Sequence, residues 1–94
     1  MIDPEYILRT SKQYGLEKQM IKTMEEAGEL IQALAKYWFK NASLEKVVQE
    51  IVDVELLLIQ LKTSLEIPEE LYQRILTANI KRFKERVDSG TKNW

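Results

Sequence analysis

Residues 17–65 decide the fold: EKQMIKTMEEAGELIQALAKYWFKNASLEKVVQEIVDVELLLIQLKTSL. Apolar residues recur every three or four positions on both sides of the short polar segment 41–43, which is the spacing of amphipathic helices. Ser43, at the end of that segment, can cap a following helix. The stretch therefore predicts two long helices, over residues 17–39 and 44–65. They should lie antiparallel because their connection is so short.

Two shorter helices are predicted outside this pair, over residues 4–14 and 68–87. Each has a proline at its start, where the missing N–H leaves no hydrogen bond unmade. Gly15 can end the first of them. Nothing in the sequence predicts a strand, a repeat or a linker, so we expect a single all-α domain over residues 1–94, built as a four-helix bundle with two long central helices.

The predicted helix over residues 44–65 is apolar around most of its circumference, which is typical of a helix buried on nearly all sides. Three other helices of a 94-residue chain can hardly cover it, and with no cysteine the chain has no disulfide to compensate for a small core. We therefore expect another copy to complete the bundle, as a homodimer or a homotetramer.

The composition excludes several classes of function. With no cysteine and no histidine, the chain cannot form a zinc finger, a thiolate nucleophile or a serine–histidine–aspartate triad. Its formal net charge is −1, with an acidic middle and a basic end, so we expect no nucleic-acid polymer as a partner. No apolar run is long enough for a membrane span, and the first residues lack a signal-peptide pattern, so we expect a cytoplasmic protein without a membrane partner.

Two pairs of acids stand out on the long helices. Glu26 and Glu29 are three residues apart, as are Glu50 and Asp53, so the members of each pair project side by side. Counted from the turn, the two pairs arrive at a similar height on facing helices. Carboxylates crowded together repel each other and favour a hard divalent cation between them, so this arrangement predicts a site for Mg²⁺, with Mn²⁺ as a possible substitute.

The same residue pattern also fits an ordinary charged surface. Glu25 can pair with Lys22, and Glu29 with Lys36, for a few tenths of a kcal/mol each. Glu55 also sits among apolar residues without belonging to any acidic pair. Spacing alone therefore leaves a metal site, a solvated charged face and salt bridges between subunits open.

The segment Glu25-Glu26-Ala27-Gly28-Glu29-Leu30, followed by Glu50-Ile51-Val52-Asp53, resembles the MazG-like family of all-α nucleoside triphosphate pyrophosphohydrolases. The signature of that family is ExxE on one helix and ExxD on the next. The resemblance covers roughly residues 16–87. It implies a magnesium-dependent enzyme that cleaves an NTP or dNTP between the α- and β-phosphates, giving the monophosphate and pyrophosphate.

Carried over position by position, the resemblance implies metal ligands at Glu26, Glu29, Glu50 and Asp53, and a base that activates water at Glu25. Asn79-Ile80-Lys81 is similar to an Asn-x-Lys element of the family's last helix. Paired arginines often follow that element, whereas here Lys84 and Arg86 are separated by Glu85. The expected substrate-binding residues are Asn79, Lys81 and Lys84, together with Trp38 as an aromatic that can stack on a base.

Two alternatives to this function remain open. One is phosphoribosyl-ATP pyrophosphohydrolase, a related all-α enzyme of similar size with a similar acidic motif. The other is a non-catalytic oligomeric bundle that serves as an interaction module, which would explain the apolar helix at 44–65 and treat the acids as surface charge.

Overall fold

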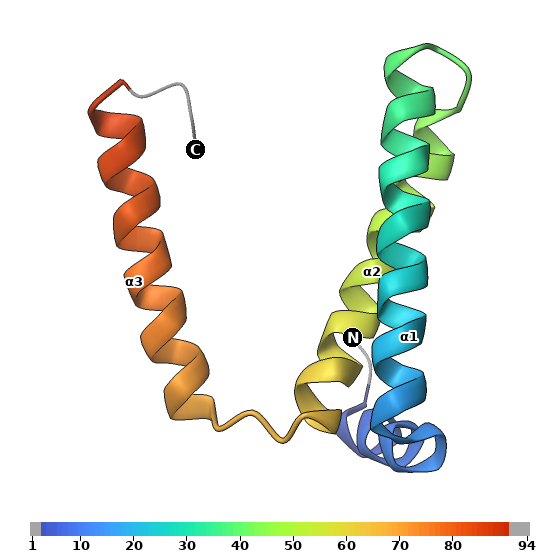
Figure 1. The fold of residues 1–94 in the computed structure, drawn as a ribbon, viewed down its shortest axis with the longest axis vertical. Coiled ribbons are helices and arrows are strands. Elements are labelled where there is room, and N and C mark those ends of the chain that lie inside the picture. The colour runs from blue at the N-terminus through green and yellow to red at the C-terminus, as the bar shows by residue number, and fades with distance from the viewer. Residues whose placement is uncertain (1–2, 91–94) are drawn as a thin grey trace.

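The computed structural model describes residues 3–90, which form helices and no strand. In chain order the helices are α1 (Pro4–Trp38), α2 (Leu44–Ser64) and α3 (Glu69–Asp88) (Figure 1). The prediction of an all-α fold is confirmed. The prediction of a four-helix bundle is wrong, because the described residues contain three helices.

Two separate helices were expected on the two sides of Gly15. Gly15 has φ 78° and ψ 164°, outside the helical region, so the helical conformation is interrupted at the expected position. The segments on its two sides are both helical and meet at a kink, and together they make up the single element α1. In Figure 1 the segment before Gly15 lies across the foot of the α1–α2 pair.

Helices α1 and α2 form an antiparallel pair (Figure 1). Lys40, in the short connection between them, adopts a positive φ of 63°. Ser43 then caps α2, because its side-chain oxygen accepts a hydrogen bond of 3.2 Å from the backbone N–H of Lys46. The predicted short connection and antiparallel pairing are both present. Residues at similar distances before and after the connection therefore lie opposite each other on α1 and α2.

Gln60, near the C-terminal end of α2, forms hydrogen bonds that join α2 to α1 at the end of the pair far from the short connection. Its side-chain amide donates to Thr10 Oγ1 (3.1 Å) and accepts from Gln19 Nε2 (3.2 Å), while its backbone carbonyl accepts from Ser11 Oγ (3.3 Å). Thr10, Ser11 and Gln19 are all buried. Hydrogen bonds of Thr10 and Ser11 with Gln60 thus join the α1 segment before the kink to α2.

Most of helix α3 stands apart from α1 and α2 (Figure 1). It contacts α2 near its start, where the ammonium of Lys62 lies 3.5 Å from the centre of the Tyr72 ring. The radius of gyration is 16.2 Å, whereas a compact chain of this length has about 12 Å. Among residues 3–90 the buried apolar side chains are Ile7, Ala33 and Val47. One chain therefore leaves most of its apolar surface uncovered, including the faces of α2 that were expected to be buried. No helix within residues 3–90 combines the length and apolarity that a membrane crossing requires.

Candidate metal centre

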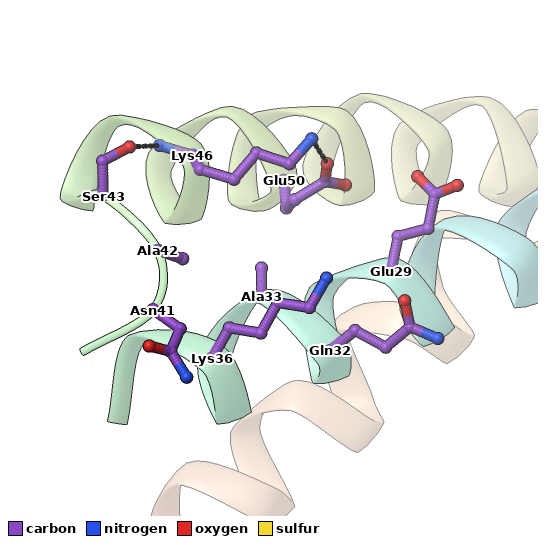
Figure 2. A pocket seen from close by; sticks show the side chains of 9 residues that line it. All are labelled: Glu29, Gln32, Ala33, Lys36, Asn41, Ala42, Ser43, Lys46 and Glu50. Atoms are coloured by element: carbon purple, nitrogen blue, oxygen red, sulfur yellow. Dashed lines mark hydrogen bonds and ion pairs between the residues drawn. The ribbon is translucent and has the colours of Figure 1, made fainter. Parts of the chain in front are cut away.

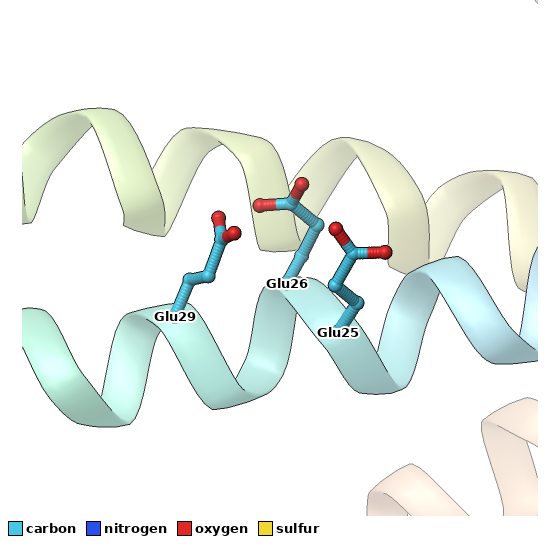
Figure 3. A group of neighbouring side chains, drawn as sticks. All are labelled: Glu25, Glu26 and Glu29. Carbon is cyan, nitrogen blue, oxygen red and sulfur yellow. The ribbon is translucent and has the colours of Figure 1, made fainter.

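Five carboxylates converge where α1 and α2 face each other. Oxygens of Glu25, Glu26 and Glu29 lie within 4.8 Å of one another, and so do oxygens of Glu26, Glu50 and Asp53. Figure 3 shows the first three carboxylates rising from the same side of α1. Glu26 belongs to both groups and joins them into one centre, which we call the carboxylate cluster.

The cluster follows from spacing and from the turn. Glu26 and Glu29 lie on successive turns of α1, and Glu50 and Asp53 lie on successive turns of α2, because residues three apart are neighbours on a helix surface. The antiparallel pairing of α1 and α2 then brings the two acidic pairs together. The four residues expected to bind metal, and the expected base Glu25, are therefore neighbours in space.

Two of these carboxylates are buried and only half satisfied. Glu50 is 3% exposed and Glu26 is 9% exposed. In each, Oε2 is buried without a hydrogen-bond partner among the described residues. An unpartnered buried carboxylate oxygen is costly, so these two atoms need a positive partner.

The other oxygen of each buried carboxylate is paired with a lysine one helical turn earlier. Lys22 Nζ lies 3.2 Å from Glu26 Oε1, and Lys46 Nζ lies 2.8 Å from Glu50 Oε1. Lys22 also pairs with Glu25 at 3.4 Å, as the surface interpretation expected, but Lys36 has no carboxylate oxygen within 4.0 Å among residues 3–90. Hydrogen bonds to their partner carboxylates raise the pKa of both Lys22 and Lys46.

Electrostatic crowding is clearest at Glu29. The neighbouring Glu26 raises the pKa of Glu29, first because its carboxylate would accept a hydrogen bond from protonated Glu29 and second through its charge; burial, Glu50 and Glu25 contribute less. Neighbouring carboxylates have this effect because each disfavours the charged form of the next. The cluster therefore holds more negative charge than its two lysines neutralise.

The donor set fits a hard divalent cation. All candidate ligand atoms are carboxylate oxygens, which suit Mg²⁺ and Mn²⁺. The two buried oxygens without a hydrogen-bond partner are available as metal ligands. Glu26, Glu29, Glu50 and Asp53 would hold the ion. A bound divalent cation would supply charge neutralisation to an anionic substrate and polarise a water molecule.

A cavity of about 440 Å³ adjoins the cluster on the side of the α1–α2 connection (Figure 2). We call it the lysine cavity. Its charged and amide-bearing lining comes from Glu29, Gln32, Lys36, Asn41, Lys46 and Glu50. In Figure 2 the Lys36 side chain extends along α1 past Ala33, and Lys46 reaches Glu50 along α2.

The residues expected to bind substrate are not brought to the cluster within one chain. Asn79, Lys81 and Lys84 lie on α3, beyond the contact that Tyr72 at its start makes with Lys62 of α2. The amide oxygen of Asn79 accepts a hydrogen bond from Arg82 of the same helix. Trp38, the last residue of α1, is 79% exposed and does not line the lysine cavity. Periodicity identified helices and their polar faces, but it could not determine how α3 is placed.

Sequence reasoning missed the part that two lysines play. Lys22 and Lys46 each precede a buried glutamate by four residues, the spacing at which side chains on a helix meet. That spacing, repeated on both helices, was the available signal.

Comparisons of the chain with models of protein families, with curated proteins and with solved structures find no match. The resemblance to the MazG-like family therefore depends on the two acidic pairs and on the motif around them.

Proposed function

We propose that the protein is a magnesium-dependent pyrophosphohydrolase of the MazG-like type, which cleaves a nucleoside triphosphate or deoxynucleoside triphosphate to the monophosphate and pyrophosphate. One observation carries the proposal: carboxylates from two helices form a single centre in which buried oxygens of Glu26 and Glu50 have no partner. A surface of solvated acids would leave no carboxylate oxygen buried and unpaired.

The chemistry requires a cation and a base. Cleavage of a phosphoanhydride needs the charge of the phosphates to be neutralised and a water molecule to be positioned in line with the bond that breaks. Glu25 is the acid best suited to accept the proton of that water. It neighbours Glu26 and Glu29 at the edge of the cluster, is exposed, and is held by Lys22 at 3.4 Å.

We also propose that the working form is a homodimer or homotetramer in the cytoplasm. The chain has 7928 Å² of accessible surface, whereas a compact monomer of 11.1 kDa has about 5,700 Å². The difference exceeds the roughly 800 Å² that each partner contributes to a standard interface. Assembly is also the route by which Asn79, Lys81 and Lys84 of one copy would meet the cluster of another.

The test is release of pyrophosphate from a panel of canonical and modified nucleoside triphosphates and phosphoribosyl-ATP, with Mg²⁺ and with EDTA. The proposal expects release that requires Mg²⁺, with the monophosphate as the other product. The double variant Glu50→Gln, Asp53→Asn should lose at least about 100-fold in rate. Glu55→Gln is the matched control, since Glu55 is an exposed acid of α2 outside the cluster.

Each result separates the alternatives. Turnover of phosphoribosyl-ATP alone would replace the nucleotide substrate with that compound. A folded oligomer that is silent across the panel would support the non-catalytic bundle. Full metal-dependent turnover by the double variant would show that the cluster is not the active centre.

A further inference from the structure

We propose that the lysine cavity binds the polyphosphate chain of the nucleotide, and that Lys46 passes from Glu50 to phosphate when a divalent cation occupies the carboxylate cluster. This inference rests on the proposed function, because it assigns the phosphate-binding side of the same site. The cavity and the cluster are contiguous, since Glu50 and Glu29 belong to both.

The position of Lys46 favours an anion. Lys46 lies in the first turn of α2, and its backbone N–H bonds to the capping oxygen of Ser43. A helix N-terminus carries the positive end of the helix dipole, which disfavours a cation and attracts a phosphate. The positive charge of Lys46 adds to the positive electrostatic potential of the helix N-terminus. This does not stabilise the helix, but it does favour binding of an anionic ligand.

The pair between Lys46 and Glu50 is suited to exchange. Lysine four residues before glutamate is the weaker order for such a pair. The Lys46 side chain is about half exposed on a flexible stem, whereas Glu50 is buried and keeps Oε2 free of partners. A divalent cation satisfies both oxygens of Glu50 better than one ammonium does, and Lys46 then loses its partner.

Within the cavity no other acid can receive the displaced ammonium. Its only acidic lining residues, Glu29 and Glu50, both belong to the cluster. Lys36, on the opposite wall, has no ion-pair partner among residues 3–90. Two ammonium groups and the amides of Gln32 and Asn41 therefore face a cavity whose carboxylates are neutralised by metal. Such a lining complements a chain of phosphates.

The experiment measures binding of inorganic tripolyphosphate and of an α,β-methylene nucleoside triphosphate by calorimetry at saturating Mg²⁺. Lys46→Met and Lys36→Met should each weaken binding of both ligands at least about tenfold, and Lys46→Arg should restore most of it. Lys18→Met is the matched control. Lys18 is an exposed lysine of α1 that lies outside both the lysine cavity and the carboxylate cluster, so binding should change less than about twofold.

Mg²⁺ binding without phosphate provides a second measurement. Both Lys46→Met and Lys22→Met should bind Mg²⁺ at least as tightly as the wild type, because each removes a competing cation from a ligand. Weaker Mg²⁺ binding by Lys46→Met alone would mean that the lysine supports the cluster, which would overturn the exchange.

Failure of this inference can be told from failure of the proposed function. Two results would overturn the phosphate site and leave the function standing, provided that Mg²⁺-dependent hydrolysis persists. One is that the wild type does not bind tripolyphosphate. The other is that Lys46→Met and Lys36→Met bind it as the wild type does. Weakened tripolyphosphate binding with unchanged binding of the nucleotide analogue would assign the cavity to free polyphosphate and overturn the nucleotide assignment. A wild type that neither binds Mg²⁺ nor hydrolyses any nucleotide would remove the function itself.

Discussion

The ammonium of Lys46 lies 2.8 Å from one oxygen of the buried Glu50 carboxylate, and the other oxygen of that carboxylate has no hydrogen-bond partner among residues 3–90. One ammonium therefore pairs with one side of a buried carboxylate. A buried group in this state costs stability, and it favours binding of a further cation at its second oxygen.

The substitution Glu50→Gln should raise the free energy of unfolding of the metal-free protein by about 1 kcal/mol. It removes a buried charge that has a partner on one oxygen only, and this gain exceeds the loss of a partly exposed ion pair. Mg²⁺ at about 100 times its dissociation constant should add about 2.7 kcal/mol to the wild type and far less to the variant. Chemical denaturation with and without Mg²⁺ measures both effects. A metal-free variant less stable by 2 kcal/mol or more would show that the ion pair is structural.

The raised pKa of Glu29 predicts how stability depends on pH. Glu26 raises this pKa in the folded chain above its ordinary value of 4.5, because its carboxylate would accept a hydrogen bond from protonated Glu29 and because its charge disfavours a second charge. Protonation therefore favours the folded state. Without metal, the wild type should gain stability relative to Glu29→Gln as pH falls through the raised value, and the gain should be complete below about 4.5. A stability difference between the two proteins that is independent of pH from 7.5 to 4 would contradict this.

Stabilisation of the wild type by Mg²⁺ should decrease over the same pH range, because the Glu29 carboxylate must be deprotonated to bind the ion.

The kink in α1 predicts opposite effects for two glycines. Gly15 has φ 78° and ψ 164°, a conformation nearly restricted to glycine, so Gly15→Ala should lower the free energy of unfolding by about 1–3 kcal/mol. Gly28 lies inside the helix with open space around it, so Gly28→Ala should raise it by about 0.5–1 kcal/mol. Thermal or urea unfolding of both variants checks the pair. Stabilisation by Gly15→Ala would mean that the kink is absent.

The polar contacts at the foot of the pair predict a loss on substitution of Gln60. The change Gln60→Leu removes the hydrogen bond that Thr10 Oγ1 accepts and leaves Nε2 of the buried Gln19 without its partner, so we expect a loss of about 1–3 kcal/mol in the free energy of unfolding. Gln73→Leu is the control, because Gln73 is exposed and bonds only within α3, and it should change stability by less than about 0.5 kcal/mol. Equal effects of the two variants would show that the Gln60 contacts contribute nothing.

The sequence predicted what depends on local spacing. Proline and serine at helix starts, the 3.6-residue period and the short connection at 41–43 were enough to predict the antiparallel pair, and the three-residue spacing of the acids then predicted their convergence. Each of these features is set by residues within one or two helical turns of one another.

The features that the sequence did not reveal depend on distant partners. The polar contacts of Gln60 join residues about 50 positions apart, and no periodicity announces them. The amphipathic pattern of α3 shows that it has an apolar face, but not which surface covers that face. Gly15 was correctly expected to interrupt a helix, yet whether a glycine ends a helix or bends it depends on the contacts made by the segment before it.

The exposed apolar stripe of α3 predicts where copies of the chain associate. Leu76, Ile80, Phe83 and Val87 lie along one side of the helix and are 37–52% exposed in the single chain. Ile80→Glu places a charge in this stripe, so self-association should weaken at least about 100-fold, because a charge buried in an apolar interface has no partner there. Ala78→Glu, on the opposite side of α3, adds the same charge and should leave association unchanged. Analytical ultracentrifugation of both variants and the wild type gives the masses, and circular dichroism checks that each is helical. A wild type that remains a monomer at micromolar concentration, or an Ile80→Glu variant that associates as the wild type does, would mean that α3 is not the surface that completes the bundle.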